Sequence, residues 1–136
     1  IAQALAEQGK YLEAIEHFKK LDPQSSYTDE ATLSLASLQL ALGFHDEAIT
    51  NYLKSAQSKD VSTRLKATTT LAEIYLENGD LKKASTTISS ISGSSKTDIL
   101  KTVLEAQLAL TSKNYTVAIE KFLSFFIHSH LIKKAV

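Results

Sequence analysis

One phrase recurs four times along the chain, and this repetition limits the fold more than any other feature. The copies are QGKYLEAIEHF (8–18), LGFHDEAITNY (42–52), NGDLKKASTTI (78–88) and SKNYTVAIEKF (112–122). Their shared alanines, Ala14, Ala48, Ala84 and Ala118, are spaced by 34, 36 and 34 residues. A period of this length predicts an array of supersecondary units, each of which buries its apolar face only against a neighbouring unit.

Each copy has the residues of a helical hairpin around it. Turn glycines stand at Gly9, Gly43 and Gly79, with Lys113 in the fourth slot, and a small residue precedes each turn by seven positions: Ala2, Ala36, Ala72 and Ala106. Apolar residues follow the shared alanine at +4: Phe18, Tyr52, Ile88 and Phe122. With further residues at +7, this spacing marks one face of an α-helix. We predict helices near 1–8, 11–21, 29–42, 46–57, 62–77, 81–91, 97–112 and 115–127.

The composition favours long helices and excludes several classes of function. The chain has 4 Gly, 1 Pro and no strand-like alternation, which predicts an all-α fold. Lys plus Arg equals Asp plus Glu at 15 each, so the chain lacks the basic surface typical of nucleic-acid-binding proteins. Cys is absent, which excludes disulfides and thiolate metal sites. No apolar run approaches the roughly 18 residues of a membrane-spanning helix, so direct membrane insertion is not expected.

The segments LASLQLALGFHDEAITNYLKSA and LAEIYLENGDLKKASTTISSI make the chain similar to a tetratricopeptide repeat (TPR) array. The resemblance implies an α-solenoid of about four antiparallel helix-hairpin repeats in a right-handed superhelix. It implies one domain over 1–136, with repeats near 1–25 (partial), 28–60, 62–95 and 97–130. The chain departs from the family in having Thr32, Thr68 and Thr102 where an early Trp is usual, and in the missing fourth glycine. Because it begins at Ile1 and contains no Met, we expect a fragment of a longer chain.

The sequence contains no pattern that predicts catalysis. The four histidines are His17, His45, His128 and His130, and none forms the i, i+4 pair of a helical metal site. No glycine-rich phosphate loop and no serine nucleophile elbow is present. We therefore expect no enzyme activity, no cofactor and no metal. His45 stands in the slot that Tyr11, Leu81 and Tyr115 occupy in the other copies, and we interpret that slot as a packing position.

The TPR resemblance implies a concave groove lined by the first helix of each hairpin, which would bind a protein or peptide. Carried over, the groove positions are Leu33, Ser37, Leu40, Lys66, Thr69, Glu73, Glu77, Val103, Gln107 and Leu110. Such a groove is apolar at both ends and acidic in the middle, which predicts a ligand with apolar anchors and a basic residue. The alternative is that several of these residues pack between helices.

The family members that bind chaperones grip a C-terminal carboxylate with Lys and Asn at groove positions. Ser37, Thr69, Glu73 and Gln107 do not supply that clamp. We predict that the chain does not bind the acidic C-termini of the large cytosolic chaperones.

The C-terminal segment FLSFFIHSHLIKKAV is apolar on more than one side, where terminal repeats normally present a polar face. Phe125, Phe126, Leu131 and Ile132 are expected to form a terminal contact, covered by a last helical turn, by further sequence or by a second copy. The favoured function is an interaction scaffold in a multiprotein assembly, and the alternative is a structural spacer or self-association segment. The host would be a periplasmic TPR protein of bacterial envelope biogenesis or secretion, anchored through a missing N-terminal segment, or a cytoplasmic subunit of a eukaryotic complex.

Overall fold

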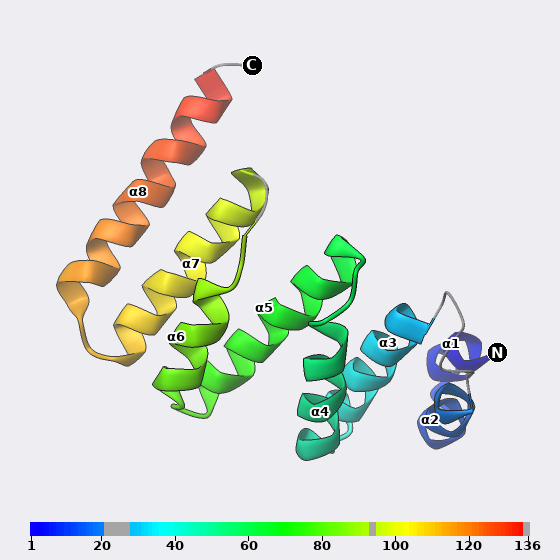
Figure 1. The fold of residues 1–136 in the computed structure, drawn as a ribbon. Helices are drawn as coiled ribbons and strands as arrows, with labels where there is room; N and C mark the ends of the chain where they lie inside the picture. Colours follow the sequence, from blue (N-terminus) through cyan, green and yellow to red (C-terminus); the bar gives the residue numbers. More distant parts are fainter. Residues whose placement is uncertain (21–27, 93–94, 135–136) are drawn as a thin grey trace. The chain divides into compact units, whose positions relative to one another are not determined.

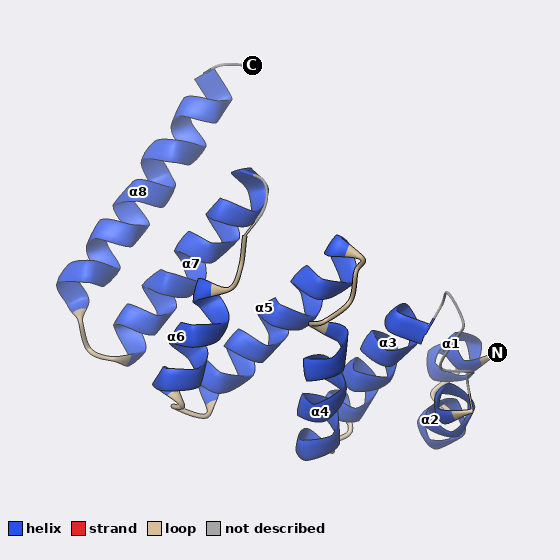
Figure 2. Cartoon of the chain, viewed as in Figure 1, coloured by secondary structure: helices blue, strands red, loops and turns tan. Residues whose placement is uncertain are grey.

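The computed structural model describes residues 1–20, 28–92 and 95–134, and within these residues it contains eight α-helices and no strand (Figure 2). The all-α prediction is confirmed. The helices are α1 (Ala2–Glu7), α2 (Tyr11–Lys19), α3 (Thr28–Ala41), α4 (His45–Ser55), α5 (Val61–Glu77), α6 (Leu81–Ser89), α7 (Ser95–Thr111) and α8 (Tyr115–Lys134).

The chain divides into two compact units, residues 1–67 and 68–136, with the division inside α5. In the first unit α1 packs on α2, α2 on α3, and α3 on α4 (Figure 1). In the second unit α6 packs on α7, and α7 packs on α8. The part of α5 that belongs to the second unit contacts α6: the Lys83 ammonium nitrogen of α6 lies 5.5 Å from the centre of the Tyr75 ring of α5.

Four helix-to-helix turns share one backbone geometry. The turn residues Gly9, Gly43, Gly79 and Lys113 have left-handed φ angles of 76°, 81°, 71° and 60°. After each of them, the next N–H donates to the carbonyl five residues earlier, as Phe44 does to Gln39 at 2.9 Å and Asn114 to Ala109 at 2.8 Å. This pair of features is the Schellman ending, which satisfies the last carbonyls of a helix and reverses the chain. The sequence predicted these turns, including the one without glycine.

The small residues of the repeated phrase lie at the centre of the helix contacts. Relative exposure is 0 % at Ala14, Ala48 and Ala84, and 1 % at Ala118. The alanines ahead of three turns, Ala36, Ala72 and Ala106, are also at 0 %. A methyl group lets two helix backbones approach closely, and the larger side chains, such as Tyr52, Ile88 and Leu104, then fill the space beside it.

Polar side chains join helices inside each unit. In the first unit, the Asn51 amide donates to the Gln39 oxygen at 2.7 Å, linking α4 to α3. In the second unit, Lys121 of α8 forms an ion pair with Glu105 of α7. The Lys101 ammonium of α7 donates to one backbone carbonyl at the end of α6 and to another just after it, that of Ile91, at 3.2 Å. These contacts fix the rotation of each helix against its neighbour, which the apolar contacts alone leave less defined.

Two expectations from the sequence are wrong. The last helix does not end near residue 127 but continues to Lys134, because no glycine or proline interrupts it. His45 is not a packing residue: it is exposed, as are Tyr11 at 44 % and Tyr115 at 60 %. This slot is the first residue of each second helix, and of its four side chains only Leu81 is half-buried.

Candidate interaction surfaces

A groove in the second unit brings together four of the predicted groove residues. It has a volume of about 390 Å³, and its lining side chains come from α5 and α7: Glu73, Leu76, Glu77, Gln107, Leu110 and Thr111. Glu73 and Glu77 are one helical turn apart, as are Gln107 and Thr111. The sequence therefore places two short rows of side chains on facing helices, with acids on one row and polar and apolar groups on the other.

In the acidic row, formed by Glu73 and Glu77, the surroundings of Glu73 shift its pKa. Partial burial raises the pKa of Glu73 above its ordinary value, and the neighbouring Glu77 carboxylate raises it further. Both effects disfavour the second negative charge in the groove. None of the six lining residues is cationic, so a bound cation would relieve the repulsion between the two carboxylates.

An apolar surface lies beside the two acids. Leu110 is 45 % exposed, although it is a large hydrophobic residue within α7, and Leu76 forms the floor of the same groove at 9 %. An exposed leucine alone is ordinary on a protein surface. Its position beside two carboxylates in one concave surface gives the groove both an apolar contact and a charged contact for a ligand.

The other predicted groove positions have different surroundings. Thr69 and Val103 are half-buried and do not line this groove. In the first unit, Leu33 and Leu40 are half-buried on α3, and Lys66 is exposed on α5. The Ser37 hydroxyl donates to the Leu33 carbonyl and accepts from the Tyr52 hydroxyl at 3.0 Å, so it joins helices.

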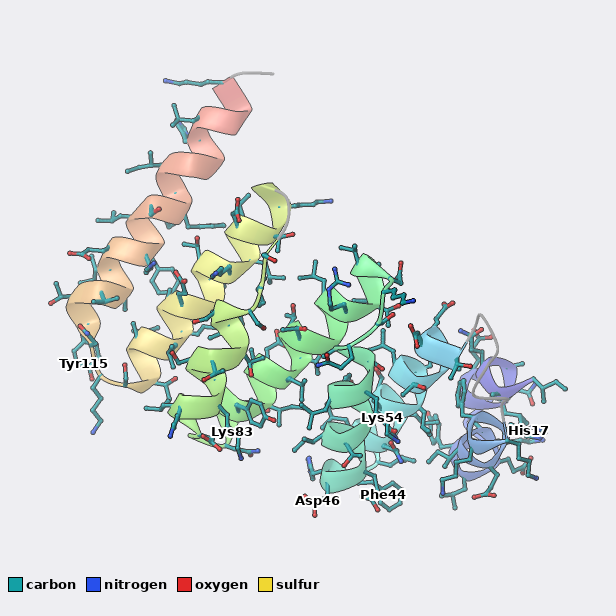
Figure 3. All side chains as sticks on the ribbon, viewed as in Figure 1. His17, Phe44, Asp46, Lys54, Lys83 and Tyr115 are labelled. Carbon is teal, nitrogen blue, oxygen red and sulfur yellow. The ribbon has the colours of Figure 1, made fainter. Side chains whose placement is uncertain are left out.

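Sequence reasoning missed a larger cavity of about 650 Å³ in the first unit, among α2, α3 and α4. Its wall includes Lys19, Lys54, Asp46, Glu47 and the pair Asn51 and Gln39. Lys54 and Asp46 are labelled on α4 in Figure 3. No sequence signal could have found it: Gln39 stands one turn after Leu35 on α3, and only the structure shows that this polar side chain is 5 % exposed.

The second unit has a smaller counterpart of about 290 Å³ among α6, α7 and α8. Lys121 and Glu105, which form an ion pair, lie in its wall. A polar pair between the second helix of a hairpin and the first thus occurs in both units. Both cavities have mixed charge or an internal ion pair, so neither offers a net charge to a ligand.

The terminal residues lie on α8. Phe125 is half-buried and meets Phe126 edge to face, with ring centres 5.9 Å apart. Phe126 and Leu131 are 66 % and 62 % exposed. The side chain of Ile132 lies outside the described residues. Figure 3 shows Tyr115, also largely exposed, at the start of the same helix.

Within the described residues, the side chains and helices form neither a metal-ligand cluster nor a membrane-spanning helix. Across residues 1–20, 28–92 and 95–134, no three metal-ligating side chains of His, Asp or Glu converge. Within the same ranges, every helix is too short or too polar to cross a bilayer. His17 is exposed on α2 and is labelled in Figure 3.

No protein-family model, curated protein or solved structure matches the chain. What the groove can bind is therefore inferred from its own side chains.

Proposed function

We propose that this chain is a TPR-like interaction module that binds a protein segment in the groove between α5 and α7. Its architecture would be a solenoid of about four helical hairpins in a right-handed superhelix. The four Schellman turns at the 34- to 36-residue period and the fully buried alanines support this architecture. A stack of hairpins of this kind presents an extended surface on which a peptide can lie.

One observation carries the functional proposal. Glu73 and Glu77 stand side by side at the rim of an open groove, next to the exposed Leu110, with no cation among the lining residues. A segment with a Lys or Arg next to an apolar residue fits these groups: the cation neutralises the acids, and the apolar side chain covers the leucine. Because both contacts come from side chains, the ligand would be selected by sequence.

A peptide-display selection against the 136-residue chain tests this ligand class. We expect enriched peptides to carry Lys or Arg within a few residues of a Leu, Ile or Phe. The double variant Glu73→Gln/Glu77→Gln keeps the shape of the groove and removes its charge. It should weaken binding of a selected peptide about tenfold or more, as for the loss of two charge-assisted contacts.

The matched control is Glu13→Gln/Glu16→Gln on α2, which removes two exposed glutamates close together on a helix outside the groove. Fluorescence anisotropy of the labelled peptide should give the same affinity for this control and for the unaltered chain. Enrichment of acidic peptides, or equal loss in both double variants, would show that the groove acids do not select the ligand.

The same charges make a negative prediction for acidic peptides. A peptide ending in several acidic residues and a free carboxylate would bring like charges next to Glu73 and Glu77. We expect no measurable binding of such a peptide in an isothermal titration at low ionic strength. Micromolar binding would contradict both the chaperone prediction and the charge argument.

A further inference from the structure

Helix α8 carries an uninterrupted row of exposed large apolar residues, which we name the α8 stripe. Its members are Tyr115, Ile119, Leu123, Ile127 and Leu131, each four residues after the last, and all are between 56 % and 62 % exposed. In the described part of the chain, no other helix has such a row. A contiguous apolar surface of this kind marks a contact with another molecule or segment.

The stripe lies on the side of α8 that faces away from its neighbour. Helix α8 packs on α7, and its buried side is marked by Ala118 at 1 % exposure and by the half-buried Phe125. At about 100° per residue, the stripe is centred on the opposite side of the helix. From Tyr115 to Leu131 it extends about 24 Å along the helix axis.

Two exposed charges lie within the arc of the stripe. Glu120 is near its beginning, and Lys134 is just beyond its end. They are equally distant in sequence from Ile127, on opposite sides of it. An antiparallel copy of the helix, related by a twofold axis at Ile127, would place Glu120 beside the partner's Lys134. The same axis would place Leu123 beside the partner's Leu131.

The charges decide the orientation. In a parallel pair, Glu120 would lie beside the partner's Glu120 and Lys134 beside the partner's Lys134, so every charged contact would be repulsive. In the antiparallel pair both contacts are attractive, and each occurs twice because the interface is twofold symmetric. The sequence of α8 is thus complementary to itself in one orientation.

From these features we propose that a second copy of this chain covers the α8 stripe from Leu123 to Leu131, forming a twofold dimer through antiparallel α8 helices. This interface is separate from the groove between α5 and α7. With the axis at Ile127 the two helices overlap from Glu120 to Lys134, so each copy buries Leu123, Ile127 and Leu131 against the other, well under the roughly 800 Å² per partner of a standard interface. The dimer should therefore be weak, with a dissociation constant in the micromolar range.

Sedimentation equilibrium of the 136-residue chain, from about 1 µM to about 500 µM, covers this range. We expect a reversible monomer–dimer equilibrium. Leu123→Glu/Ile127→Glu should leave only monomer over the whole range, with an unchanged far-UV circular dichroism spectrum. The control Leu12→Glu, at a residue 68 % exposed on α2, should dimerise as the unaltered chain does. A chain that is monomeric at every concentration would overturn the proposal, as would a dimer that survives the stripe substitutions.

Charge exchange tests the orientation. Glu120→Lys alone and Lys134→Glu alone each place like charges at both ends of the interface, and each should weaken the dimer at least tenfold. An equimolar mixture of these two single variants should dimerise again, because all the contacts between unlike variants are attractive. The combined variant Glu120→Lys/Lys134→Glu should also dimerise. Single variants that dimerise as well as the unaltered chain would overturn the antiparallel interface.

The groove proposal can be tested without this result. Glu73→Gln/Glu77→Gln should lose its peptide and keep its dimerisation, and the stripe variants should keep their peptide. Failure of one proposal therefore leaves the other standing.

Discussion

At the scale of single residues, the four turns show what backbone conformation requires of a sequence. Gly9, Gly43 and Gly79 adopt left-handed φ angles, and a Cβ added at any of them would meet no atom within 4 Å. A side chain there would therefore be disfavoured by the backbone conformation and not by collision. Lys113 adopts the same conformation with a side chain, so the fourth turn carries a strain that the other three avoid.

Replacing Lys113 by glycine should therefore stabilise the protein. Release of the left-handed strain gains roughly 1–2 kcal/mol, and the greater freedom of glycine in the unfolded chain takes back about 0.5–1 kcal/mol. We expect a net rise of about 0.5–1 kcal/mol in the free energy of unfolding, measured by urea denaturation. Gly43→Ala is the reverse experiment and should lower the same free energy by about 1 kcal/mol. A loss of stability in Lys113→Gly would mean that the lysine side chain makes a contact worth more than the strain.

At the scale of helices, the buried alanines set the distance between neighbours. Ala84 is 0 % exposed within α6, which packs on α7. Leucine at this position has three extra carbon atoms in a space that is already filled. We expect Ala84→Leu to lower the free energy of unfolding by about 1–3 kcal/mol. Lys82→Leu adds the same side chain at an exposed position of α6 and should change it by less than about 0.5 kcal/mol. Equal effects would show that α6 does not depend on close approach at Ala84.

The groove between α5 and α7 gives the stability a defined pH dependence. The raised pKa of Glu73 means that the folded state binds its proton more tightly than the unfolded state does. This contribution favours the folded state at low pH and is lost as the pH rises from the unfolded pKa, about 4.3, through the higher folded value. Glu73→Gln should therefore be more stable than the unaltered chain at pH 7, and the difference should vanish below about pH 4.

The gain at pH 7 should be only a few tenths of a kcal/mol, because the Glu73 side chain is largely exposed to solvent. Urea denaturation series at several pH values measure it. Glu77→Gln removes only the lesser of the two causes and should give a smaller gain. At each pH, the quantity compared is the stability of Glu73→Gln minus that of the unaltered chain. If this difference were lower at pH 7 than at pH 4, the assignment would be refuted.

Local features were predictable from the sequence because they depend on a few neighbouring residues. A glycine between two helical patterns, or an alanine four residues before an aromatic, determines a turn or a close contact wherever it occurs. The groove residues Glu73, Glu77, Gln107 and Leu110 were predicted in a different way, by carrying groove positions over from the TPR resemblance, and these four line one groove in the structure.

The remaining features depend on contacts between segments far apart in the sequence. The cavity among α2, α3 and α4 arises from how three helices meet, and no local pattern encodes it. The role of Ser37 depends on Tyr52, fifteen residues away, which takes the serine into a contact between helices. The end of α8 was missed for another reason: the helix was expected to end near residue 127, with a further turn only one of three ways to cover the apolar end, but it continues to Lys134.

At the scale of the whole chain, the two units differ in how much apolar surface they bury. In the first unit, α1 is a helix of six residues with none buried, and it packs mainly on α2. In the second unit, the buried side chains include Leu71, Ile88, Ile91 and Leu104, each at 3 % exposure or less. If the stability of a repeat array is a sum of local terms, its ends should open more often than its centre.

Native-state hydrogen exchange should therefore follow a gradient along the chain. We expect the amides of α1 to exchange fastest, after correction for their intrinsic rates, because opening this helix exposes almost no apolar surface. The amides of α7 should be among the slowest, because Leu104, Ala106 and Ala109 are all buried and α7 contacts both α6 and α8. Protection of α8 around Ile127 should be intermediate at low concentration and should increase at concentrations where the dimer forms, because the outer face of this part of the helix is exposed in a single chain. Uniform protection from α1 to α8 would mean that the chain unfolds in one cooperative step and not as an array of locally stabilised hairpins.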